Sequence, residues 1–315
     1  MSAMQTRYPS SILEEELKNK VAVKTYALFT EGTGQGVHER SNVSALAEAC
    51  VRDGAQRVHL ETGPGTRLGT IITGRLFGFD ALDILMRHYS WLAQRYRPEA
   101  DAKIFIFGFS RGALIARALA DLICVCGIPA DAYDARRVLK WWRSGGYGEA
   151  LAAFRRERRL FDVSVEYLGV WDTVDSSVGI SGAKYRRVPE KVAQARHAVA
   201  RDERRCFFRY EPMEGPQAEE MVFPGSHSDV GGIYPDNHAV ADVALAWIAA
   251  PAITRGLRLR PGVSFSENLA PGEAVLHDSL HDATNVWGHL PESARALEKV
   301  RHHPICRLLD NFAIS

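Results

Sequence analysis

The sequence has little of what marks several large classes of protein. Its five cysteines are scattered through 315 residues without a CxxC pair, and their odd number argues against a disulfide scaffold. Among 11 histidines there is no HExxH motif and no spacing of Cys and His that suits a metal ion. We therefore expect reduced thiols, no metal site and no cofactor.

Long apolar runs and a strong net charge are also absent from the sequence. No stretch reaches the roughly 18 apolar residues of a membrane span, and residues 11–20 are polar where a signal peptide would be apolar. This predicts a cytoplasmic protein in the producing cell, which only a Sec-independent system could export. The formal net charge of +1 gives no general attraction to nucleic acid, so we expect no nucleic-acid partner.

The patterns that are present alternate between strand and helix periodicity. Short apolar runs predict strands at residues 21–30, 56–61, 104–107, 163–171, 205–210 and 220–223. Helical spacing predicts helices at residues 41–53, 79–96, 113–124, 133–160, 188–202 and 240–249. This alternation is typical of an α/β fold, with a mostly parallel central sheet and helices on both faces. Without repeats or linkers, we expect one domain over residues 1–315.

One segment within this pattern is a candidate insertion. Residues 130–162 are helical in pattern and hold Trp141, Trp142 and Phe154 among arginines. They suit a small helical cap that opens at a lipid surface. A helical hairpin packed on the core is the alternative.

The motif that carries chemistry lies between a predicted strand and a predicted helix. Gly108-Phe109-Ser110-Arg111-Gly112 is G-x-S-x-G in the strand–turn–helix context of a nucleophile elbow. The serine of such an elbow sits on a sharp, strained turn, so the flanking glycines let strand and helix pass closely. We therefore expect Ser110 to be a nucleophile at the carboxyl edge of an α/β-hydrolase-like sheet. A plain strand–turn–helix loop with a serine cap is the alternative.

A serine hydroxyl needs a base beside it, held by a carboxylate. In α/β-hydrolases the chain order is Ser, then Asp or Glu, then His. Asp172 and His227 follow Ser110 in that order, each just past an apolar run, and we predict a Ser-His-Asp triad. Because such ends meet at one edge of a parallel sheet, the three side chains should lie together.

Other residues could take these roles. Asp175 is a substitute for Asp172, and His277, in a late apolar context, is a rival base. Asp229 could orient His227 locally, although a carboxylate two residues away reaches the ring less easily. Asp172 and His227 could also be structural residues in tight loops.

The oxyanion of an acyl intermediate needs backbone N–H donors. The amide of Arg111, directly after the nucleophile, should supply one. The glycine-rich loop after the first strand should supply another from Gly32, Thr33 or Gly34. This loop lacks the ending of a P-loop and does not spell GxGxxG, which argues against a nucleotide site.

These motifs, taken with others along the chain, resemble the DUF2235 group of α/β-hydrolases, which includes type VI secretion lipase effectors of the Tle1 (phospholipase) type. The matching stretches, between about residue 21 and residue 282, are residues 31–35, 63–66, 108–113, 169–174, 195–205, 223–232 and 277–279. The family pattern assigns the nucleophile to Ser110, the acid to Asp172 and the base to His227. Chain order gives the same assignment.

The resemblance implies a serine esterase or lipase of the phospholipase A type, acting on glycerophospholipids at a membrane surface. It also implies an antibacterial secreted effector with an immunity protein and a partner in the secretion apparatus. The family's first loop reads Asp-Gly-Thr followed by Asn, whereas this chain has Glu31-Gly32-Thr33 and Gln35. That departure keeps open a binding protein on a decayed hydrolase fold. An esterase acting on soluble esters is a further alternative.

Overall fold

The centre of the fold is a parallel sheet. The computed structural model describes residues 24–32, 40–64, 80–98, 102–145, 148–157, 159–175, 180, 182–269, 272–280, 295–297 and 299–309. Within them, seven strands pair in the order β2-β1-β3-β6-β7-β8-β9, and every pairing is parallel. The strands are β1 (Thr25–Thr30), β2 (Gln56–Glu61), β3 (Lys103–Phe109), β6 (Tyr167–Trp171), β7 (Ala195–Ala200), β8 (Ala218–Phe223) and β9 (Arg301–His302). The predicted mostly parallel α/β sheet is confirmed.

The strand order identifies the point where a site is expected. The chain moves outward from β1 to β2 and then crosses back to β3 on the other side of β1. Crossovers therefore leave in opposite directions at β1 and β3, and a crevice opens beyond their carboxyl ends at such a reversal. Glu31 follows β1 and Ser110 follows β3, so both lie at this point.

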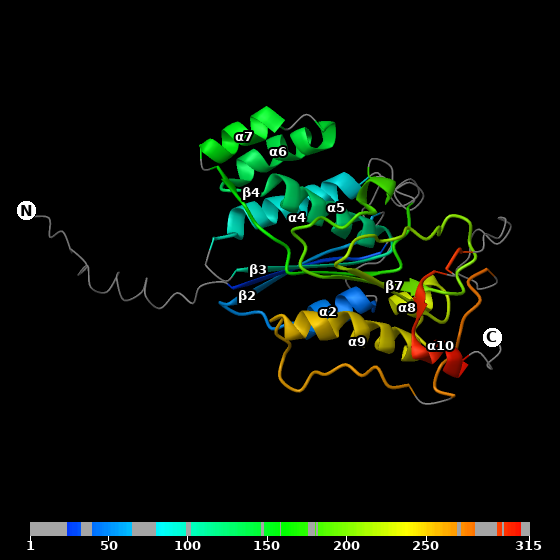
Figure 1. Ribbon diagram of the computed structural model, residues 1–315. Coiled ribbons are helices and arrows are strands. Elements are labelled where there is room, and N and C mark those ends of the chain that lie inside the picture. The colour runs from blue at the N-terminus through cyan, green and yellow to red at the C-terminus, as the bar shows by residue number, and fades with distance from the viewer. Residues whose placement is uncertain are drawn as a thin grey trace, which may run out of the picture.

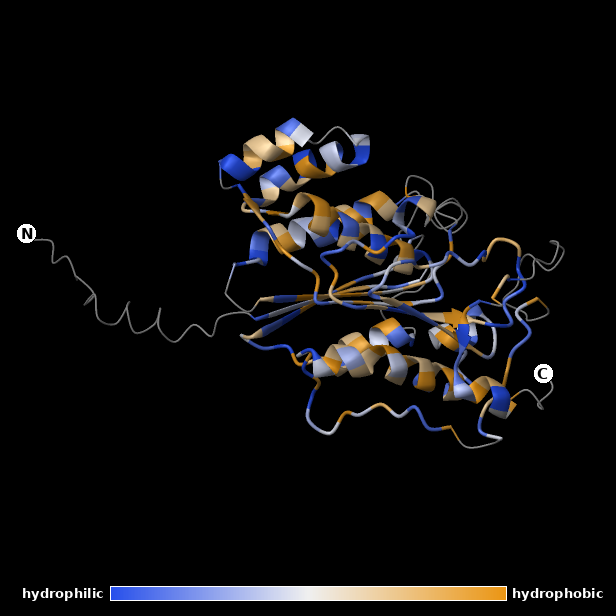
Figure 2. Cartoon of the chain, viewed as in Figure 1, coloured by the Kyte–Doolittle hydropathy of each residue, from blue (hydrophilic) through white to orange (hydrophobic). Residues whose placement is uncertain are grey.

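Helices cover both faces of the sheet (Figure 1). On one face lie α4 (Ala81–Arg95), α5 (Arg111–Cys126), α6 (Ala132–Ser144) and α7 (Gly148–Arg156). On the other lie α2 (Asn42–Ala49), α8 (His227–Gly231), α9 (Ala239–Thr254) and α10 (Pro304–Leu309). Figure 2 shows hydrophobic residues gathered in the sheet and on the adjoining sides of the helices.

Both faces of the strands are apolar because both are covered. In β1, Tyr26 and Leu28 belong to the core shared with α4 and α5, whereas Ala27 and Phe29 belong to the core shared with α2 and α9. All four side chains are fully buried. This is why the strands appear in the sequence as continuous apolar runs rather than alternating ones.

Two predicted elements were wrong. Residues 188–202 were predicted as a helix, but Ala195–Ala200 form β7, which pairs with both β6 and β8. Its alanines favour a helix locally, and pairing on both sides overrides that weak preference. Residues 205–210 were predicted as a strand, but they form a loop with isolated bridges, one of which joins Tyr210 to Val174.

The candidate cap segment forms a helical pair outside α4 and α5. A two-stranded ribbon of β4 (Ile128–Pro129) and β5 (Leu160–Phe161) joins α6 and α7 to the rest of the chain. Trp142 of α6 is 2% exposed, and its Nε1 donates to Asp121 of α5 at 2.7 Å. The Trp142 indole therefore faces the core. A single domain with this pair as a cap stays a prediction.

Candidate active site

Ser110 lies on a strained turn between β3 and α5. In the described part of the chain, Ser110 and Asp172 are the two non-glycine residues with positive φ, at 59° and 37°. A Cβ on Gly108 would come within 2.4 Å of the Gly112 carbonyl oxygen, and one on Gly112 within 2.2 Å of the Glu31 oxygen. Because these are backbone atoms, no side-chain movement could relieve the contacts. Both glycines of the motif are therefore required by close approach of the backbone.

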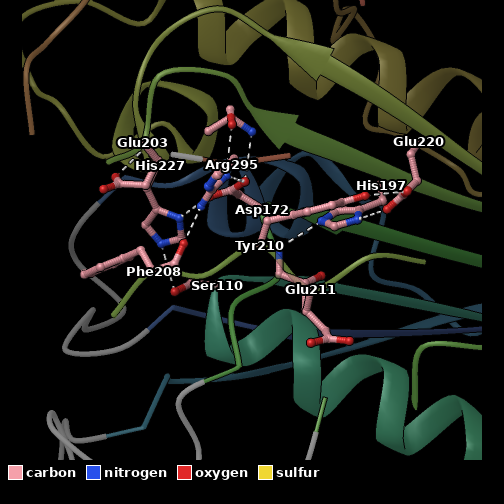
Figure 3. A network of polar contacts seen from close by, with 12 residues as sticks. Ser110, Asp172, His197, Glu203, Phe208, Tyr210, Glu211, Glu220, His227 and Arg295 are labelled. Carbon is pink, nitrogen blue, oxygen red and sulfur yellow. Dashed lines mark hydrogen bonds and ion pairs between the residues drawn. The ribbon is translucent and has the colours of Figure 1, made fainter. Parts of the chain in front are cut away.

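The three residues of the predicted triad are in hydrogen-bond contact (Figure 3). His227 Nε2 lies 2.9 Å from Ser110 Oγ, and His227 Nδ1 lies 2.6 Å from Asp172 Oδ2. Since Asp172 is a carboxylate, Nδ1–H donates to it and Nε2 is left to accept the serine proton. The structure thus brings together side chains that are 55 and 117 residues from His227 in the chain.

His227 is held by its own helix and by aromatic side chains. It opens α8, where the backbone N–H and Oγ of Ser226 both donate to Asp229 Oδ2. The imidazole packs between Phe109, at a centroid distance of 4.5 Å, and Phe208, at 4.9 Å. Burial lowers the pKa of His227, against the opposing hydrogen bond to Asp172. The lowered pKa favours the neutral ring, which is the form that can act as a base.

The two alternates for the triad contact each other. His277 Nδ1 lies 2.6 Å from Asp229 Oδ1, and His277 Nε2 lies 3.0 Å from Asp236 Oδ2. Burial would lower the pKa of His277, but hydrogen bonds to the two carboxylates outweigh burial and raise it. Asp229 is thus engaged with His277 and the Ser226 cap, and Asp172 rather than Asp175 bonds to His227.

Besides His227, Asp172 has a cationic partner, Arg295, which the sequence analysis missed. Arg295 Nη1 donates to Oδ1 at 2.6 Å and Nη2 donates to Oδ2 at 2.9 Å. Burial would raise the pKa of Asp172, but the Arg295 guanidinium and the bond from His227 hold it well below its usual range. No motif marks Arg295, and it lies 123 residues from Asp172, so the chain itself carries no signal for this pair.

The loop after β1 adjoins the elbow. The Glu31 carbonyl oxygen lies close to Gly112, and a Cβ on Gly63 would overlap the Gly32 carbonyl oxygen. The backbones of three loops therefore pack against one another here. Burial raises the pKa of Glu31 to about 7, opposed by hydrogen bonds from Ser41, Ser44 and the Gly32 amide. Arg111 is the first residue of α5. Thr33 and Gly34 lie outside the described residues.

A second polar network fixes the residue after Asp172. The Thr173 amide donates to His197 Nε2 at 2.9 Å, so Nδ1 of the same ring donates to Glu220 Oε1 at 2.8 Å. The Tyr210 hydroxyl donates to Glu220 Oε2 at 2.5 Å. His197 lies in β7, within the segment that was predicted as a helix, and it supports the turn that presents Asp172.

A family profile decides the relationship of this chain to known proteins. The profile, described as the catalytic domain of Tle1-like phospholipase effectors of the T6SS, matches residues 24–251. The chain belongs to this family. The match contains Ser110, Asp172 and His227, whereas Arg295 lies beyond it.

Three individual proteins are similar to parts of this Tle1-like chain. A structure of the Tle1 effector bound to the VgrG spike of the Type 6 secretion system is 21% identical, with a TM-score of 0.42 over 68% of this chain and 51% of that one. An uncharacterized protein from Pseudomonas aeruginosa is 18% identical, with a TM-score of 0.48 over 81% of this chain and 50% of that one. A 150-residue stretch is 29% identical to uncharacterized protein YEL023C of Saccharomyces cerevisiae, covering 42% of this chain and 22% of the yeast protein. The chain thus spans about half the length of the two solved structures.

The described residues offer neither a membrane-spanning helix nor a cluster of metal ligands. None of their helices combines the length and apolar character needed to cross a membrane. Across the same residues, no group of three or more His, Cys, Asp or Glu side chains could hold a metal ion. The side chains that meet here are a serine hydroxyl, an imidazole and a buried carboxylate, which are the groups that a Ser-His-Asp triad combines.

Proposed function

We propose that this Tle1-like chain is a serine carboxylic ester hydrolase that cleaves acyl esters of glycerophospholipids, as a phospholipase A. The observation that carries the proposal is the pair of contacts made by His227, at 2.9 Å to Ser110 Oγ and 2.6 Å to Asp172 Oδ2. The family supplies the phospholipid substrate class. The contacts supply the reaction class, acyl transfer through serine.

The proposed reaction follows from the roles available to these side chains. Ser110 Oγ attacks the ester carbonyl while His227 Nε2 takes its proton, and Asp172 stabilises the imidazolium. The amide of Arg111, with donors from residues 32–34, stabilises the oxyanion. His227 then protonates the leaving lysophospholipid, and water repeats the sequence to release the fatty acid. The strained φ of 59° at Ser110 supports this assignment, because such strain is concentrated at functional residues.

We further propose contact with a lipid surface through the loop beside His227. Phe207 is 56% exposed, and its neighbour Phe208 packs on the His227 ring. Arg209, also exposed, would meet the phosphate of a head group. The indole of Trp142 is buried against α5, so this side chain of the α6–α7 pair does not face a membrane.

Membership of the family also supports a biological role for the chain. We propose an antibacterial effector that a type VI secretion system exports, carried by a component of that apparatus such as a VgrG spike, with an immunity protein in the producing cell. These partners are proposals for the whole protein.

The experiment treats phospholipid vesicles with the wild-type chain, with Ser110→Ala and with Ser264→Ala as a control at an exposed serine. Mass spectrometry should detect free fatty acid and lysophospholipid from the wild type and the control, and neither from Ser110→Ala. Release by Ser110→Ala at the wild-type rate would exclude the mechanism. Hydrolysis of soluble p-nitrophenyl esters without lipid release would favour an esterase of soluble esters. Failure of a fluorophosphonate probe to label Ser110 would favour a decayed binding protein.

A further inference from the structure

Arg295 donates several hydrogen bonds through its two terminal nitrogens behind the triad (Figure 3). Its side chain is 3% exposed, and its two terminal nitrogens bond to both oxygens of Asp172. Nη1 also donates to the Ala200 carbonyl at 2.9 Å, and Nη2 to the Phe208 carbonyl at 2.7 Å. A buried guanidinium with a bidentate carboxylate is held far more rigidly than a surface ion pair.

We infer that Arg295 is a positioning residue of the triad, which fixes the Asp172 carboxylate in the orientation that His227 needs and offsets its negative charge. The inference rests on the proposed function. It also assigns a role to a residue that the family match over residues 24–251 does not include.

Four hydrogen-bond donors surround the Asp172 carboxylate. Oδ1 accepts from the Ala200 amide and Arg295, and Oδ2 accepts from His227 and Arg295. Asp172 sits on a strained turn at φ 37°, and such strain persists only where surrounding contacts hold the residue. Arg295 also holds the carbonyl of Phe208, whose ring packs against His227. One guanidinium therefore fixes two neighbours of the imidazole.

The charge of Arg295 also affects how tightly His227 holds a proton. The charged groups around its ring are Asp172 beyond β6, Glu203 and Arg205 after β7, Arg295, and Asp229 within α8. Glu203 is paired with Arg205 and Asp229 with His277, so the Asp172–Arg295 pair completes a shell of compensated charges. Without Arg295, the anion of Asp172 would stabilise the imidazolium more strongly, and His227 would keep its proton to higher pH.

The position of Arg295 depends on the last described segment of the chain, which packs against the rest of the fold. Residues 301–302 form β9 against β8, and Ile305 and Leu309 of α10 are buried in the core shared with α2 and α9. The packing of this segment beside β8 is what delivers Arg295 to Asp172. The completed triad therefore needs a part of the chain outside the matched family region.

The test uses the full chain with Arg295→Gln and Arg295→Lys, and with Arg258→Gln as a control. Arg258 pairs with Asp53 through both carboxylate oxygens on the exposed surface, so its loss removes a comparable pair without touching the triad. The readout is kcat/KM for a soluble p-nitrophenyl ester between about pH 5 and about pH 9, with thermal unfolding measured alongside.

In Arg295→Gln we expect the acid limb of the plot of kcat/KM against pH to move up by about one pH unit. The fall in kcat/KM relative to the wild type should then be roughly tenfold larger at low pH than at high pH. Arg295→Lys, which keeps the charge, should shift less, and Arg258→Gln should not shift. A loss of activity equal at every pH would mean a merely structural role and would overturn the inference. An unchanged profile would do so as well.

A second readout separates this inference from the proposed function. The NMR titration of the His227 ring, assigned by its loss in His227→Gln, reports the imidazole without any substrate. An upward shift in Arg295→Gln supports the inference even if the wild type hydrolyses no ester. An unshifted ring overturns it even if the wild type is an active lipase.

Discussion

Replacing Asp172 by Asn should lower the rate of ester hydrolysis and destabilise the fold. Both effects have the same cause, the loss of hydrogen-bond acceptors at this side chain. The carboxylate accepts four hydrogen bonds, from the Ala200 amide, from His227 Nδ1 and from both terminal nitrogens of Arg295. An asparagine offers one oxygen and one NH₂, so two of these four donors must face the NH₂, which is itself a donor. If the NH₂ faces His227, the ring adopts the other tautomer and Nε2 carries the proton that Ser110 needs to lose. If it faces Ala200, a buried amide loses its acceptor.

The two consequences have different magnitudes. Loss of the correct imidazole tautomer lowers kcat by about 10⁴-fold in a serine triad of this kind. Leaving the buried Arg295 guanidinium without its counter-ion costs about 3–5 kcal/mol of the free energy of unfolding, because an uncompensated charge stays in a site of low dielectric. Asp172 is fully buried and the Arg295 side chain is 3% exposed, so solvent screens neither group.

The assay combines ester hydrolysis with urea unfolding, and uses Asp175→Asn as the matched control. Asp172→Asn should lose at least about 10³-fold in kcat/KM, while the control should stay near the wild type. The double variant Asp172→Asn/Arg295→Gln should lose less free energy of unfolding than the two single losses add up to, by a coupling of about 1–3 kcal/mol. The reason is that it no longer buries the unpaired Arg295 guanidinium. Its activity should not recover. Activity of Asp172→Asn within tenfold of the wild type would refute this account of the site.

Three further changes probe the surroundings of the triad. Glu31→Gln should flatten the pH dependence of stability. Burial raises the pKa of Glu31 from 4.5 to about 7, so the protonated carboxyl contributes fully to the free energy of unfolding at low pH, and this contribution is lost as pH rises through that range. The difference, on the order of 3 kcal/mol, is checked by urea unfolding at about pH 5 and about pH 8, and parallel curves for both proteins would contradict it. His197→Leu removes the acceptor of the Thr173 amide and a donor to Glu220, and each unmet group costs about 1–3 kcal/mol; an unchanged melting temperature would argue against this network. Phe207→Ser should reduce vesicle hydrolysis roughly tenfold and leave soluble esters unaffected, and equal losses on both substrates would exclude a lipid contact.

Much of the fold and the core of the candidate site could be predicted because the signals are local. The strand before Ser110, the two flanking glycines and the following helix are adjacent in sequence, and the observed close contacts at Gly108 and Gly112 explain why glycine is needed. The ends of parallel strands meet at one edge, so chain order sufficed to predict that Asp172 and His227 lie near Ser110.

The failures share the opposite property. Ala195–Ala200 form a strand because β6 and β8 lie on either side, and neither neighbour is visible in the local composition. His277 has apolar neighbours and follows Ser110 in the chain, so the sequence left it open as a base. Only the folded chain pairs it with Asp229 and Asp236.

By itself, the sequence determined the class of fold and the position of the candidate nucleophile Ser110, because periodicity and a tight glycine-flanked turn are properties of neighbouring residues. Tertiary structure alone decided which charges surround His227. Electrostatic contacts act through space over a few ångströms, and the chain distance of 123 residues between Arg295 and Asp172 leaves no trace in any local pattern. The buried pair exists because β9 and α10 dock beside β8 and bring that arginine to the strained end of β6.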